Sequence, residues 1–185
     1  MLKINYLECV VVMNILKAGL FYLIAVAILT VYGVEVCPFL DQLEPLQVAE
    51  VLVLGFAVSG ILRVLIFSWL RRNCEGLAGP VGLKPATHLI VDLGLWVLAA
   101  AIVGTWNFWY FGFLLESGLK VVLECITIGI FSSAYLALDA EHDLITSLSE
   151  AGNLEELRTQ KVFSITTKFM VFVGASLVVI SAVVL

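Results

Sequence analysis

The sequence predicts an all-α integral membrane protein, a bundle of about five transmembrane helices with an inner amphipathic connector. Of its 185 residues, 62% are hydrophobic and only 14% are charged, and its mean hydropathy is +1.09. A water-soluble domain of this size needs much more polar surface to cover one core. The apolar residues also form long runs, each close to the roughly 20 residues with which a helix crosses the hydrocarbon layer. Together these observations predict a protein that resides in a lipid bilayer.

Five apolar runs are interpreted as membrane spans of one transmembrane domain, at residues 10–36, 46–70, 86–104, 120–138 and 165–185. Lys17 lies inside the first run, and its long side chain is expected to extend back to the membrane interface. Small residues recur four apart at Gly55 and Ser59 and at Gly129 and Ser133. This spacing is typical of helices that pack closely in membranes.

Basic residues predict the orientation of the spans. Arg71 and Arg72 close the second run, and loops rich in Lys and Arg stay in the cytoplasm. Residues 37–45 hold two prolines and two acids but no basic residue, which favours the outer side, as do the clustered aromatic residues of 105–113. We therefore expect a bacterial cytoplasmic membrane protein with a cytoplasmic N-terminus and, after five spans, a periplasmic C-terminus.

Arg63 and Asp92 are predicted to form an ion pair within the membrane. Arg63 precedes Arg71 by about 12 Å of helix, and Asp92 follows Pro85 by about 10 Å, at a rise of 1.5 Å per residue. The two helices are antiparallel neighbours, so the two residues lie at matching depth. Such a pair either fixes the helix register or acts as a polar switch.

A second polar group is expected near the outer surface, where acidic and aromatic residues cluster. Glu116, Lys120 and Glu124 repeat every four residues and therefore share one face of a helix. These residues either anchor the helix ends or frame a pocket that opens outward, with the members Glu50, Trp106, Trp109, Tyr110, Glu116, Lys120 and Glu124.

The connector at residues 139–164 begins with four ionisable groups, Asp139, Glu141, His142 and Asp143. Charged groups are costly in hydrocarbon, so the fourth helix is expected to emerge into water here as a helical extension. Because the connector lies on the inner side, it is the candidate element for carrying a signal.

No cofactor and no metal are expected. His88 and His142 are the only histidines, and two imidazoles can ligate a b-type haem. His88 lies close to the inner boundary, however, whereas His142 follows the end of its span, so facing ligands at one depth are not expected. No basic patch supports binding of nucleic acid.

Two segments carry a resemblance to known proteins. Ala137–Ile145 (Ala-Leu-Asp-Ala-Glu-His-Asp-Leu-Ile) and Ser164–Phe169 (Ser-Ile-Thr-Thr-Lys-Phe) resemble the N-terminal membrane anchor or sensor regions of bacterial multidomain signalling proteins, of the class III adenylate/guanylate cyclase or sensor kinase type. The resemblance implies an input module that acts on a C-terminal effector domain.

The leading hypothesis is a membrane-embedded sensor or anchor module that passes a ligand or lipid signal through helix shifts. No catalytic motif occurs, so the chain itself is not expected to be an enzyme. Its expected partners are the lipid bilayer, a small ligand, and either a second copy or an effector domain. The alternatives are a small membrane transporter or transport subunit, with Asp92 on its path, and the b-type haem subunit.

Overall fold

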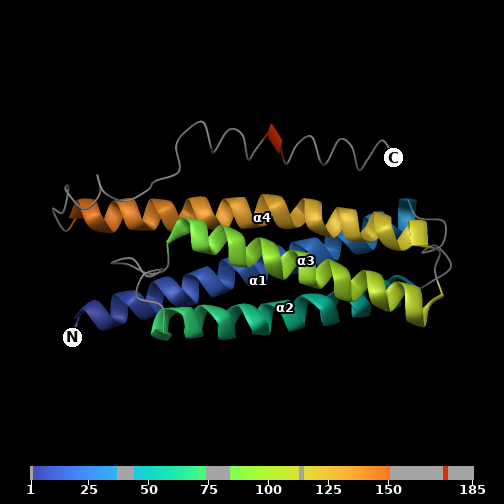
Figure 1. The fold of residues 1–185 in the computed structure, drawn as a ribbon, viewed down its shortest axis with the longest axis horizontal. Coiled ribbons are helices and arrows are strands. Elements are labelled where there is room, and N and C mark those ends of the chain that lie inside the picture. The colour runs from blue at the N-terminus through green and yellow to red at the C-terminus, as the bar shows by residue number, and fades with distance from the viewer. Residues whose placement is uncertain (1, 37–43, 74–83, 113–114, 151–172, 175–185) are drawn as a thin grey trace.

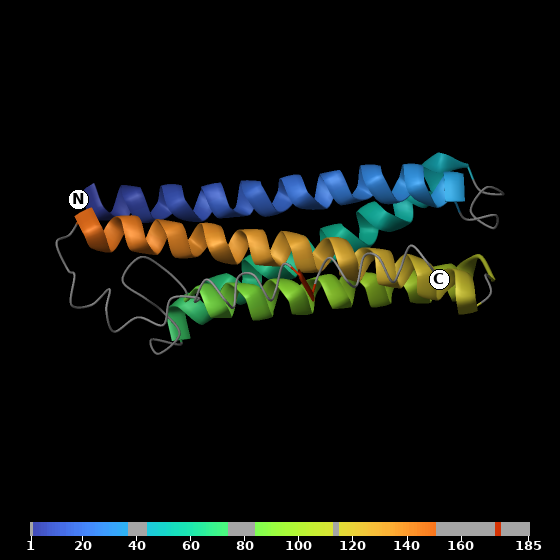
Figure 2. The same ribbon diagram turned by 90° about the horizontal axis from the view of Figure 1, so that it is seen from above.

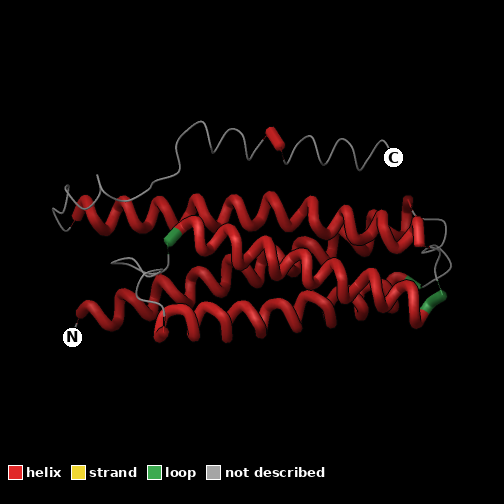
Figure 3. Tube along the Cα trace, in the orientation of Figure 1, coloured by secondary structure: helices red, strands yellow, loops and turns green. Residues whose placement is uncertain are grey.

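The computed structural model describes residues 2–36, 44–73, 84–112, 115–150 and 173–174. Nearly all of them belong to four helices: α1 (Leu2–Val36), α2 (Pro45–Asn73), α3 (Pro85–Tyr110) and α4 (Leu115–Glu150). No strand occurs within these ranges (Figure 3). The all-α class is therefore confirmed for the described residues.

Each of the four helices contains a segment long and apolar enough to cross a membrane: Asn14–Val31, Pro45–Leu70, Pro85–Tyr110 and Gly118–Ser149. The predicted fifth span, 165–185, lies outside the described residues except for Val173 and Gly174, which are helical. Four helices of this kind are thus established, and the count of about five stays a prediction.

Prolines set two of the helix starts. Pro45 and Pro85 are the first residues of α2 and α3, a position where the missing N–H of proline costs no hydrogen bond. α3 continues past Gly104, where the sequence predicted the third span to end, and stops only at Tyr110. The aromatic run contains no helix breaker until Gly112, whose φ of 65° is a conformation that glycine adopts readily.

The helices run alternately in opposite directions, and each contacts the next along the chain, while α4 also contacts α1 (Figures 1 and 2). The described residues thus form an up-down-up-down four-helix bundle. The "outer end" of the bundle is where α1 ends and α2 begins, and the "inner end" is where α2 ends and α3 begins.

An aromatic cluster occupies the middle of the bundle core. Tyr22, Phe56 and Trp96 come from α1, α2 and α3, and the centroids of their rings lie 5.0–5.6 Å apart in each pair. Toward the outer end the core continues with small and branched apolar residues, including Ala25, Leu29, Val51, Leu52, Ala99 and Val103. This half of the bundle is held together by apolar packing.

The contact between α3 and α4 is the most extensive in the bundle. It depends on Gly129, where an added Cβ would lie 2.5 Å from the Cβ of Trp96. The indole of Trp96 therefore rests directly on the backbone of α4. Gly104 permits a second close approach, because a Cβ there would lie 2.5 Å from Cγ2 of Val122.

α1 and α4 both extend beyond the ends of α2 and α3 at the inner end (Figures 1 and 2), where Figure 1 shows them apart from each other. With 35 and 36 residues, they are each roughly 50 Å long, whereas the hydrocarbon layer is about 30 Å thick. We call residues 139–150 of α4, with the first turns of α1, the α1–α4 extension. Residues 139–150 continue α4 without a break.

Candidate functional site: a polar layer inside the bundle

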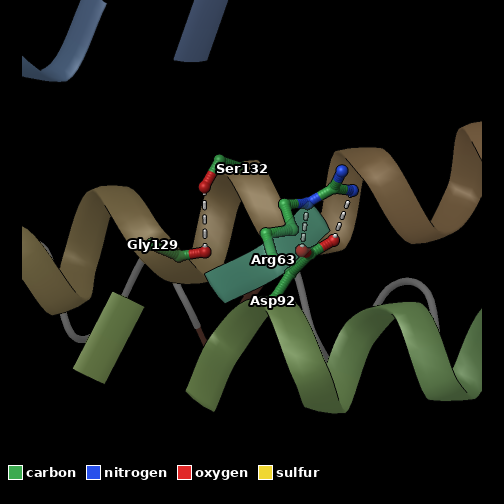
Figure 4. A network of polar contacts seen from close by, with 4 residues as sticks. All are labelled: Arg63, Asp92, Gly129 and Ser132. Atoms are coloured by element: carbon green, nitrogen blue, oxygen red, sulfur yellow. Dashed lines mark hydrogen bonds and ion pairs between the residues drawn. The ribbon is translucent and has the colours of Figure 1, made fainter. Parts of the chain in front are cut away.

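The structure brings Arg63 and Asp92 together in the bundle interior (Figure 4). Nε of Arg63 donates to Oδ1 of Asp92 at 2.6 Å, and Nη2 donates to Oδ2 at 3.2 Å. The two side chains are only 5% and 2% exposed. A bidentate, charge-assisted contact of this kind fixes both the distance and the relative orientation of α2 and α3.

Three buried serines lie on the helices next to this ion pair. Ser59 lies one turn before Arg63 on α2, and Ser132 and Ser133 belong to α4, which passes beside the pair (Figure 4). The hydroxyl of Ser132 donates to the carbonyl oxygen of Gly129 at 3.1 Å. We call Ser59, Arg63, Asp92, Ser132 and Ser133 the polar layer.

The polar layer is linked on both sides to aromatic rings. Toward the inner end, the guanidinium of Arg63 lies 4.6 Å from the ring centroid of Phe67, whose ring packs against His88 at 4.7 Å. Toward the outer end, Phe56 and Trp96 each lie one turn from members of the layer. The polar layer therefore lies between aromatic side chains toward both ends of the bundle.

The chemistry of the polar layer favours a positioning role. A buried ion pair contributes little net stability compared with apolar packing, but removing one partner leaves a charge in a low-dielectric interior. The side chains of Arg63 and Asp92 are already engaged with each other, and the layer contains no base placed to activate a serine. The Arg63–Asp92 pair fixes the register of α2 against α3.

A second ion pair joins the first helix to the last. Nζ of Lys17 lies 2.5 Å from Oδ2 of Asp139, with side-chain exposures of 33% and 17%. The sequence predicted that Lys17 would extend to the interface, whereas the structure gives it a partner on α4. Because partly exposed ion pairs contribute little stability, this pair mainly aligns α1 with α4 where the α1–α4 extension begins.

Most of the chain matches a known protein family. Residues 21–185 match the MASE10 family, which comprises membrane-associated sensor domains. The chain belongs to the MASE10 family. The matched region includes the whole polar layer and Asp139, whereas Lys17 precedes it. Searches of curated proteins and of solved structures returned no match.

The four ionisable residues that open the connector of this MASE10 chain have different environments. Asp139 is paired with Lys17, Glu141 is 1% exposed, Asp143 is half-buried and His142 is exposed. Ala137, Glu141, Leu144 and Leu148 are all buried and follow a 4-3-4 spacing. Such spacing places all four on one side of α4, so one face of α4 stays buried along residues 137–148.

The structure divides the predicted outer pocket of the MASE10 chain among separate places. Trp106, Trp109 and Tyr110 line a hollow of about 510 Å³ on one face of α3, together with Ala101, Ile102 and Thr105. Glu124 instead lines an internal space between the four helices. Glu50 and Lys120 are exposed, and the side chain of Glu116 lies outside the described residues.

Sequence reasoning missed Asn107, which is 5% exposed. Its position in the helix could have identified it as buried. Asn107 follows the buried Val103 by four residues, on the same face of α3 as the buried Asp92 and Trp96. Ser59 and Ser133 were predicted only as small residues that permit close packing, and Ser132 was not predicted; all three are buried on α2 and α4.

The two histidines of the MASE10 chain occupy unlike positions. His88 is buried against Phe67, and His142 is exposed on α4. Among the residues that the structure describes, no group of three or more His, Cys, Asp or Glu side chains is arranged to hold a metal ion. The arrangement gives the haem interpretation no support.

Proposed function

We propose that this chain is the input module of a bacterial signal-transduction protein, which receives a small-molecule or lipid signal and passes it along shifted helices. Membership of the MASE10 family supports the sensory role. The observation that carries the proposal is the α1–α4 extension, because α1 and α4 both continue past the bundle at one end and are joined by the Lys17–Asp139 ion pair where they do so.

In this proposal the polar layer is the part of the bundle that switches between two arrangements. Packed helices shift by about 1–2 Å in known switches, and a buried bidentate pair favours discrete positions over a continuous slide. A ligand that binds one arrangement better changes the population of both. The aromatic cluster connects the polar layer with the outer half of the bundle, where the signal is received.

The positions of basic residues indicate on which side of the membrane the signal leaves the module. Arg72 and Lys84 lie at the inner end, the same end as the α1–α4 extension, and segments rich in basic residues stay in the cytoplasm. The N-terminus is then cytoplasmic, and a C-terminus beyond a fifth span is periplasmic. The receiver of the signal is an effector domain of the cyclase or kinase type, or a second copy of the chain.

Hydrogen exchange tests the coupling without knowledge of the ligand. In lipid nanodiscs, Asp92→Asn should change amide exchange in residues 139–150 by about tenfold, equivalent to about 1.4 kcal/mol, because it weakens the ion pair that holds the register. The matched control is Glu50→Gln, which also neutralises an acid but at an exposed position of α2. Unchanged exchange in 139–150 after Asp92→Asn would contradict the proposal.

A further inference from the structure

A small internal space lies in the outer half of the bundle, separate from the polar layer. All four helices line it, with Leu29 from α1, Leu52 from α2, Val103 from α3 and Val121 from α4 among its apolar walls. Asn107 of α3 and Glu124 of α4 are the polar residues of its described lining. The volume open to the centre of a water-sized molecule is about 10 Å³.

Both polar side chains line this space away from bulk water. Asn107 is 5% exposed and Glu124 is half-buried, and their positions on α3 and α4 bring them to the same space. An amide carries two donors and one acceptor group, and a carboxyl carries two oxygens. Buried groups of this kind are normally satisfied by protein atoms or by an ordered water.

The size and the donor set of the space favour one water molecule as its occupant. A space of roughly 10–15 Å³ by this measure is enough for one water that has polar partners. A Ca²⁺ ion needs about six to eight oxygen ligands, more than one amide and one carboxyl supply. The apolar walls exclude anions and larger polar molecules, which leaves a single water.

We propose that Asn107 and Glu124 hold one water molecule, through which the Glu124 carboxyl exchanges a proton with the outer aqueous side. In the forward step a hydronium ion gives its proton to a carboxylate oxygen, which leaves neutral carboxylic acid and water; the reverse step restores both. The water and proton site stands without the signalling role. Only the idea that this proton is a signal for the module rests on the proposed function.

The charged groups around the site allow this exchange. Lys120 lies one turn from Glu124 on α4, and Glu50 lies next to the lining residue Val51 on α2; both are exposed. Tyr110 of α3 is exposed beyond Asn107, and the described wall on α1 contributes Leu29, which does not titrate. Among these titratable groups, Glu124 alone lines the internal space.

Infrared difference spectroscopy of the full chain in phosphatidylcholine vesicles tests the site. Between acidic and neutral pH, we expect a carbonyl band of a protonated carboxyl group that Glu124→Gln abolishes and Glu50→Gln leaves intact. A water O–H band that shifts in ¹⁸O-labelled water should disappear in Asn107→Leu. Val121→Leu, which fills the space but keeps both polar groups, should also remove the water band and keeps the test open if Asn107→Leu does not fold.

The outcomes separate the site from the signalling role. A carboxyl band that persists in Glu124→Gln, or a labelled-water band unchanged by Val121→Leu, would overturn the site whatever the chain does in signalling. A band that titrates while amide exchange in 139–150 is the same at both pH values would support the site and count against its use as a signal. Changes in both would support the two proposals together.

Discussion

Asp92→Ala should lower the free energy of unfolding by about 3–5 kcal/mol, because it leaves the Arg63 guanidinium charged in an interior where it is only 5% exposed. Arg63→Ala should cost a similar amount for the same reason. The double variant should lose much less than the sum of the two, since neither charge is then stranded. Unfolding in lipid bicelles, followed by tryptophan fluorescence, gives all three values.

The control for this cycle is Arg72→Ala, which removes an exposed arginine from the same helix. Its effect should stay within about 0.5 kcal/mol, as is usual for surface positions. Additive losses for Arg63→Ala and Asp92→Ala would show that the two groups do not interact in the bilayer.

Gly129→Val should destabilise the protein by about 1–3 kcal/mol or more, because its Cβ would lie 2.5 Å from the Cβ of Trp96 and force α3 and α4 apart. The matched control is Gly94→Ala on α3, where no atom lies within 4 Å of an added Cβ. That change should be neutral or stabilising by up to about 1 kcal/mol, since alanine favours helix.

The same bicelle unfolding measurement distinguishes the two glycines. Equal effects at Gly129 and Gly94 would mean that α3 and α4 do not approach as closely as the structure has them.

Local patterns in the sequence were enough to predict the fold class and part of the polar layer. Arg63 and Asp92 could be placed at one depth because α2 and α3 are consecutive and antiparallel, so residue counts from a shared loop fix their heights. Close packing at Gly129 and Ser133 followed from their four-residue spacing. Both inferences required only helix geometry and neighbouring elements.

The remaining features depend on contacts between elements far apart in the chain. Lys17 and Asp139 are separated by 122 positions, and no count of helix turns relates α1 to α4. The residues of the predicted outer pocket do not come together. Glu124 lines the space between the helices, whereas Trp109 is 83% exposed on the outside of the bundle. Helical spacing groups residues on one face, but only the bundle determines which faces meet.

Cysteine accessibility tests most directly the central claim that the α1–α4 extension leaves the membrane on the side opposite the aromatic end of α3. Arg72→Cys, His142→Cys and Trp109→Cys are introduced singly into a chain whose four native cysteines are replaced by alanine. Each is then treated with an impermeant maleimide from either side of sealed membranes. We predict labelling of positions 72 and 142 from one side and of position 109 from the other. Labelling of positions 142 and 109 from the same side would contradict the account.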